Sequence, residues 1–131
     1  MTLEYSGNLR HGGDLGGLCG KLARFMTTLE AGGSRVFPPG GVRVRAIACD
    51  DYCIADGSLP DAGFVHAVLK IAAGRSEAAK QAAVTGLFEI MKLHFADAFA
   101  NRGLALSLEL SEFSEAGTLK HNNLHARFKP S

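Results

Sequence analysis

The feature that most constrains the fold of this chain is an order of elements that occurs twice: strand, helix, strand. The second occurrence carries the clearer signals. Apolar side chains alternate with others over 64–71 and again over 104–110, the period of two that is typical of a strand with one buried face. Between these segments, apolar residues spaced three and four apart predict a helix from Ser76 to about Asn101, with Gly103 as its stop.

The first occurrence is shorter. It consists of a predicted strand over Thr2–Ser6, an amphipathic helix from Asp14, and a second strand over Val42–Ala48. A strand, a crossover helix and a strand imply a parallel pair within each unit. We therefore expect an α/β (α+β) fold in a single domain over residues 1–131, a duplicated β-α-β in which a four-stranded mixed sheet carries two helices on one face. Its predicted parts are a first repeat over about 1–52, a second over about 63–113, and a C-terminal tail over 114–131.

A stripe of leucines suggests that this sheet is covered on both faces. Leu104, Leu106, Leu108 and Leu110 share one face of the last predicted strand. Two helices cover only one face of a four-stranded sheet, so we expect other subunits to cover the second.

Composition excludes several classes of protein. The formal net charge of +1 argues against a broad electrostatic surface for nucleic acid or membranes. No apolar run approaches the ~18 residues of a membrane span, and the N-terminus lacks the basic-then-apolar pattern of a signal peptide. The cysteines Cys19, Cys49 and Cys53 are too few for a disulfide framework, so we expect a cytoplasmic protein.

One arginine occupies a position suited to anion binding. Arg75 follows the predicted strand 64–71 and precedes a helix that Ser76 can cap. Free backbone N–H groups and a guanidinium can hold an anion together at such a junction. The alternative is a surface arginine in a tight turn.

Several segments in order resemble the tautomerase superfamily and, within it, the 5-carboxymethyl-2-hydroxymuconate delta-isomerase family. The resemblance covers almost the whole chain. Its segments are LEYSGNLR near the start, GGVRVR at 40–45, ADG at 55–57, FVHAVLKIAAGRS at 64–76, LALSLEL at 104–110, and the tail HNNLHARFK.

The resemblance implies a homotrimer whose helices lie outside and whose sheets face the threefold axis. It implies a cofactor-free 1,3-allylic proton shift on a small dienol carboxylate from aromatic-acid degradation, with no metal. The arginines that bind substrate carboxylates and stabilise the dienolate charge would be Arg43, in GVRVR, and Arg75, in AAGRS.

The chain departs from the family at its first residue. In the family an N-terminal proline is the general base, and an apolar residue follows it two positions later. Here Met1 stands at the position of that apolar residue. One account is a start assigned a few residues late. The other is a catalytically inactive trimer that has lost its base and acts as a binding module. Retention of Arg43 and Arg75 fits the first account better, and we expect the chain as printed to be a poor isomerase.

Four further residues have two interpretations each. His66 either lines the pocket or is a structural histidine, and Arg45 either helps to bind a third carboxylate or forms an ion pair between subunits. His121 and His125 have the H-x3-H spacing of zinc sites, but no Cys-x2-Cys pair accompanies them. We therefore expect these two histidines to serve in packing or subunit contact.

Overall fold

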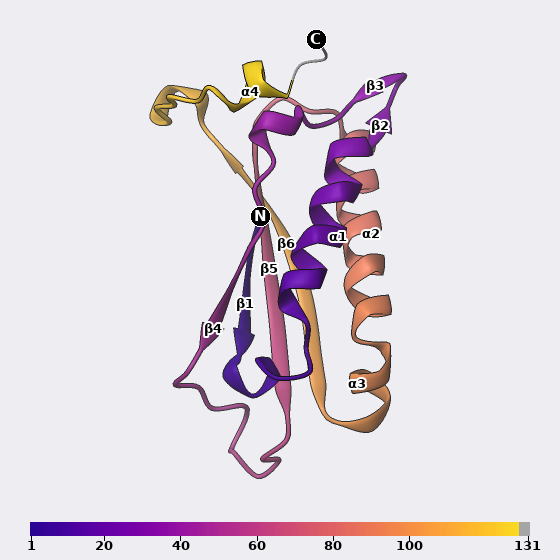
Figure 1. Cartoon of the computed structure of the whole chain (residues 1–131), viewed down its shortest axis with the longest axis vertical. Coiled ribbons are helices and arrows are strands. Elements are labelled where there is room, and N and C mark those ends of the chain that lie inside the picture. Colours follow the sequence, from indigo (N-terminus) through magenta and orange to yellow (C-terminus); the bar gives the residue numbers. More distant parts are fainter. Residues whose placement is uncertain (129–131) are drawn as a thin grey trace.

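A four-stranded sheet with two long helices packed on one face forms the body of the protein, seen edge-on to the layers in Figure 1. The computed structural model describes residues 1–128, so the last three residues of the predicted tail lie outside the described part. The strands of the sheet, in spatial order, are β4 (Arg45–Cys49), β1 (Thr2–Ser6), β5 (Gly63–Ala72) and β6 (Leu104–Phe113). The helices that cover it are α1 (Leu15–Thr28) and α2 (Glu77–His94).

The pairing of the strands confirms the predicted mixed sheet. β1 runs parallel to β4, and β5 runs parallel to β6. The two central strands, β1 and β5, are antiparallel. Each parallel pair is joined through a connection that contains one long helix, α1 in the first unit and α2 in the second, because parallel neighbours need a crossover connection.

Both helices begin at the capping residues that the sequence contains. Asp14 Oδ1 accepts a hydrogen bond from the Gly17 N–H at 3.1 Å, and Ser76 Oγ accepts one from the Ala79 N–H at 3.1 Å. The helices approach each other closely at Gly86, where an added Cβ would lie 2.6 Å from Cε2 of Phe25. The residues that they bury are Leu15, Leu18, Leu22 and Met26 of α1 and Ala79, Ala83, Leu87 and Met91 of α2.

Several predicted elements have different bounds in the structure; β6, for example, extends to Phe113 instead of ending at residue 110. The strand expected over Val42–Ala48 begins only at Arg45, because a 3-10 turn, η2 (Pro39–Gly41), precedes an extended connection. The helix expected to reach Asn101 is interrupted at Phe95, whose φ of −102° and ψ of 18° separate α2 from the short α3 (Ala96–Asn101). The Phe95 side chain is 2% exposed, so the interruption lets it enter the core.

Some short elements were not predicted. β2 (Glu30–Ala31) and β3 (Ser34–Arg35) form a hairpin whose turn contains Gly32 and Gly33, both with positive φ. The others are the 3-10 turns η1 (Gly7–Leu9) and η3 (Glu115–Gly117) and the helix α4 (Leu124–Arg127). Among the helices of residues 1–128, none is long and apolar enough to cross a membrane.

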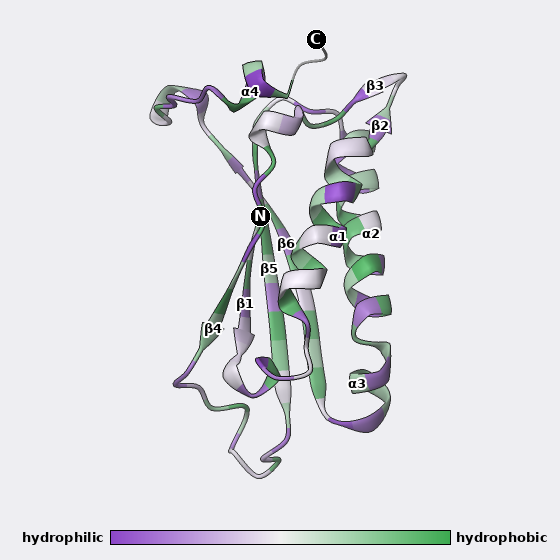
Figure 2. Cartoon of the chain, viewed as in Figure 1, coloured by the Kyte–Doolittle hydropathy of each residue, from purple (hydrophilic) through white to green (hydrophobic). Residues whose placement is uncertain are grey.

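The leucine stripe of β6 faces the helices rather than the open side of the sheet. Its four leucines pack against the core that α1 and α2 cover and are only partly buried because β6 is an edge strand. Figure 2 shows the hydrophobic segments of β5, β6 and α2 that meet in this core. The stripe therefore does not by itself require a second layer. The alternate residues on the open face, among them Glu4, His66 and Glu109, are more polar.

Candidate functional site

An open cavity of about 800 Å³ lies where β5 runs past the end of its pairing with β1. Val68 of β5 pairs with Thr2 of β1, and the residues of β5 beyond it, 69–72, pair only with β6. These residues form one wall of the cavity, and the connection from η2 into β4 forms the opposite wall. The cavity thus exists because the central strands differ in length.

Positive charge predominates around this cavity. Its lining includes the cations Arg43, Arg45, Lys70, Arg75 and Lys120, against the acids Glu4, Glu109 and Glu115. The Lys120 ammonium lies 3.1 Å from Glu115, so that pair is largely neutral. The remaining excess of cations suits a ligand with several carboxylates. The four residues selected from the sequence, Arg43, Arg45, His66 and Arg75, all line this one cavity.

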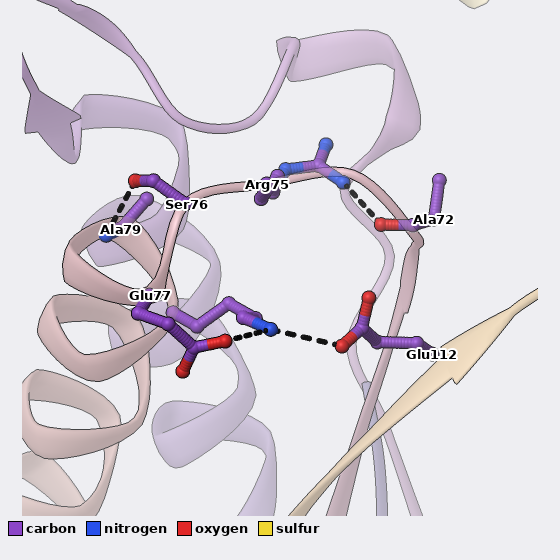
Figure 3. Close-up of polar contacts among 7 residues, drawn as sticks. Ala72, Arg75, Ser76, Glu77, Ala79 and Glu112 are labelled. Atoms are coloured by element: carbon purple, nitrogen blue, oxygen red, sulfur yellow. Dashed lines mark hydrogen bonds and ion pairs between the residues drawn. The ribbon is translucent and has the colours of Figure 1, made fainter.

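Arg75 is held in place by the backbone around it. Its Nε donates to the Val36 carbonyl at 3.1 Å and its Nη1 donates to the Ala72 carbonyl at 3.2 Å. The guanidinium carbon also lies 5.0 Å from the centroid of the Phe37 ring. Figure 3 shows the side chain directed toward Ala72, whereas Ser76 caps α2 on the other side. The remaining guanidinium N–H groups are therefore presented in a fixed orientation.

An ion-pair network supports the turn that carries Arg75. Lys80 Nζ lies 2.7 Å from Glu77 Oε1, within α2, and 3.0 Å from Glu112 Oε1, near the end of β6. Figure 3 shows Glu77 and Glu112 turned toward each other below Arg75. Hydrogen bonds to Glu77 first and then Glu112 raise the pKa of Lys80, so this side chain stays charged. The network ties the start of α2 to the end of β6.

Arg43 and Arg45 stand on the opposite wall beside the Met1 amino group. Arg43 is exposed in the extended connection, and Arg45 is the first residue of β4. The Met1 amino group donates to the Arg43 carbonyl at 2.8 Å. Burial lowers the pKa of this amine, and the positive charges of Arg45 and Arg43 lower it further. An amine in this position is more often neutral near pH 7 and thus better able to accept a proton.

His66 lies on the open face of the sheet. Its contacts agree in part with each of the two interpretations, a pocket-lining residue and a structural histidine. It lines the cavity, and its ring is also hydrogen-bonded: Nδ1 lies 2.6 Å from Ser107 Oγ and Nε2 lies 3.3 Å from Glu109 Oε1. Glu4 is its partner across β1 and β5. His66 is therefore fixed by β6 while it faces the cavity.

The sequence interpretation missed the contribution of the tail to the site. Lys120, Asn122 and His125 line the cavity although they follow the last strand of the sheet. Asn122 Nδ2 donates to the Gly40 carbonyl at 3.1 Å, and a Cβ at Gly40 would lie 2.6 Å from the backbone nitrogen of His125. Only a glycine lets α4 pack so closely on η2. Within residues 1–128 no group of three or more His, Cys, Asp or Glu side chains is placed to hold a metal.

Comparison with solved structures first defines the fold. A crystal structure of a member of the cis-3-chloroacrylic acid dehalogenase family has the same fold, with a TM-score of 0.62 over 94% of this chain and 82% of that one at 13% identity. The duplicated β-α-β fold is therefore shared with that structure.

Sequence comparison then identifies the family. The family model described as 5-carboxymethyl-2-hydroxymuconate isomerase matches residues 1–128. The 5-carboxymethyl-2-hydroxymuconate Delta-isomerase of Escherichia coli is 43% identical over 129 residues, 98% of each chain. A crystal structure of a 5-carboxymethyl-2-hydroxymuconate isomerase from Deinococcus radiodurans R1 is 45% identical, with a TM-score of 0.89 over 98% of this chain and 92% of that one. The chain belongs to the 5-carboxymethyl-2-hydroxymuconate isomerase family.

Proposed function

We propose that the protein is a cofactor-free isomerase that moves a C=C bond by proton transfer in 5-carboxymethyl-2-hydroxymuconate or a similar dienol acid. Membership of the isomerase family supports this proposal. The single structural observation that carries it is the gathering of Arg43, Arg45 and Arg75 around one cavity. Deprotonation of such a substrate creates a dienolate whose charge must be stabilised, and fixed cations provide that stabilisation.

The arginines have distinct roles in this proposal. Arg75 binds one carboxylate and stabilises the developing charge from an orientation already fixed by Val36 and Ala72. Little side-chain freedom is then lost on binding. Arg43 binds a carboxylate from the opposite wall, and Arg45 assists it. Each charge-assisted contact contributes about 1.5–3 kcal/mol. His66 lines the cavity beside them.

The register of the sheet indicates where a proton carrier would lie. Thr2 pairs with Val68 in the antiparallel ladder. Two residues placed ahead of Met1 in the same register would stand opposite Lys70 and Ile71, both of which line the cavity. The Met1 amino group lies about 7 Å short of that point, since two extended residues span this length. A proline in the family position is therefore proposed as the base.

The test compares the chain as printed with a variant in which Met1 is replaced by Pro-His-Leu. Ketonisation of 5-carboxymethyl-2-hydroxymuconate is followed by ultraviolet absorbance in both. Turnover that is fast in the variant and slow in the printed chain supports the proposal. Loss of that turnover in Arg75→Gln and Arg43→Gln supports the assigned roles. Turnover in neither chain, with the dienol still bound, overturns the isomerase and favours the inactive trimer that acts as a binding module.

We also propose that the protein is a homotrimer, with other copies covering the open face of the sheet. This face carries Ile47, whose exposed fraction is 49%, next to the polar residues Glu4 and His66. Sedimentation velocity is expected to give the mass of three chains. Ile47→Asp is expected to dissociate the assembly, because it places a charge in the covered face. A monomer in the unaltered protein would refute the trimer.

A further inference from the structure

Lys70 is a cation of the cavity that the proposed mechanism leaves without a role. It lies near the end of β5, two residues past Val68, the last residue of that strand with a partner on β1. Its side chain is exposed, whereas its neighbours Leu69 and Ile71 are turned into the core with 2% and 5% exposed. Lys70 therefore shares the open face with His66 and reaches the cavity from the β5 wall.

Lys70 differs from the other lysines of residues 1–128 because its ammonium has no hydrogen-bond or ion-pair partner among these residues. The others each contact a side chain within 3.1 Å: Lys21 with His94, Lys80 with Glu77 and Glu112, Lys92 with Glu89, and Lys120 with Glu115. The nearby acid Glu109 is already in contact with His66. Within residues 1–128 of a single chain, the Lys70 ammonium thus has no ionic partner and can contact a ligand in the cavity that it lines.

The cavity lining contains cations on three separate segments, enough to contact a ligand with three carboxylates. Arg43 and Arg45 stand on the β4 side, Arg75 stands at the turn after β5, and Lys70 lies on β5 between these two groups. Arginine offers a planar fork that suits a carboxylate held in one orientation, whereas lysine offers a compact charge on a flexible stem. A carboxylate on a rotating CH₂ branch is the kind of group that such a mobile charge can follow.

We propose that Lys70 binds the branch carboxylate of the substrate and selects dienol acids with three carboxylates over those with two. This inference rests on the proposed isomerase function, because it names the substrate class of the same cavity. Lys70 is then a residue that determines specificity through direct contact, while Arg43 and Arg75 bind the carboxylates common to both classes of substrate.

The first experiment compares two substrates that differ only in the branch. 5-Carboxymethyl-2-hydroxymuconate has three carboxylates, and 2-hydroxymuconate lacks the carboxymethyl group. The variant Lys70→Met is measured in whichever form of the N-terminus is active. Its kcat/KM for 5-carboxymethyl-2-hydroxymuconate is expected to fall about 10-fold or more, mainly through KM. Its kcat/KM for 2-hydroxymuconate is expected to change less than about two-fold. Lys70→Arg should retain the preference. Lys92→Met, on the outer surface of α2, is the matched control and should change neither value.

If Lys70→Met lowers kcat/KM equally for both substrates, or lowers it for neither, the proposed role of Lys70 is overturned. A binding measurement separates this outcome from failure of the isomerase proposal. Calorimetric titration with propane-1,2,3-tricarboxylate and with glutarate uses no turnover at all. We expect the unaltered protein to bind the tricarboxylate about 10-fold more tightly, and we expect Lys70→Met to lose that preference. If turnover is absent but this preference depends on Lys70, only the isomerase proposal fails. Equal affinity of the unaltered protein for both compounds refutes the inference about Lys70.

Discussion

Replacing Gly86 by alanine is expected to destabilise the protein, although alanine is the better helix former. Gly86 lies inside α2, and an added Cβ would stand 2.6 Å from Cε2 and 2.9 Å from Cε1 of Phe25 on α1. Helix propensity favours alanine by about 1 kcal/mol. Forcing a methyl group into a packed contact costs about 1–3 kcal/mol. The free energy of unfolding is therefore expected to fall by about 1 kcal/mol.

Gly16 provides the matched control in α1. A Cβ there would meet no heavy atom within 4 Å, so Gly16→Ala is expected to raise the free energy of unfolding by about 0.5 kcal/mol. Urea denaturation at one fixed protein concentration measures both changes. In a protein that also carries Phe25→Leu, Gly86→Ala should raise the free energy of unfolding, because the ring that the added Cβ would meet is gone. A Gly86→Ala protein as stable as the unaltered one would refute the close packing of α1 on α2.

Three further predictions concern other contacts. Arg75→Lys keeps the charge but loses the guanidinium fork that donates to two backbone carbonyls. The KM for the dienol should therefore rise about 10-fold. An unchanged KM in steady-state assays would contradict this. His94→Leu removes the 2.9 Å hydrogen bond to the Gly13 carbonyl and should lower the free energy of unfolding by about 1 kcal/mol in urea, whereas the exposed Lys21→Met should change it by less than about 0.5 kcal/mol. The Met1 amine has its pKa lowered from 8.0 in the folded chain, so the unfolded chain binds this proton more tightly and stability should increase as pH rises through the interval below 8.0. An N-terminally acetylated chain should lack this contribution, and identical pH profiles for the two chains would contradict it.

The sequence predicts those parts of the fold that depend on local periodicity. Alternation from Val42 onward sets Arg43 and Arg45 apart from Val42 and Val44. In the structure both arginines are exposed and both valines are half-buried, although the strand begins only at Arg45. Exposure follows the alternation of an extended chain even where no ladder forms. The caps Asp14 and Ser76 are also local, because each bonds an N–H three residues further on.

The parts that the sequence does not predict depend on contacts between distant segments. Arg75 donates to Val36, 39 residues earlier, and no local pattern indicates that partner. Asn122 bonds Gly40, 82 residues earlier, and so brings the tail to the cavity. The interruption at Phe95 likewise depends on the space available in the core, since the helical spacing of apolar residues continues through it.

The cavity takes part of its wall from Met1 and part from the segment that contains Asn122 and His125. An affinity tag or fusion partner joined at Met1 would therefore be attached beside the cavity. The loop over 51–60, between β4 and β5, lies at the far pole of the molecule in Figure 1 and supplies no residue to the cavity lining. Immobilisation or fluorescent labelling of this protein is better directed to that loop, where the exposed thiol of Cys53 already offers a point of attachment.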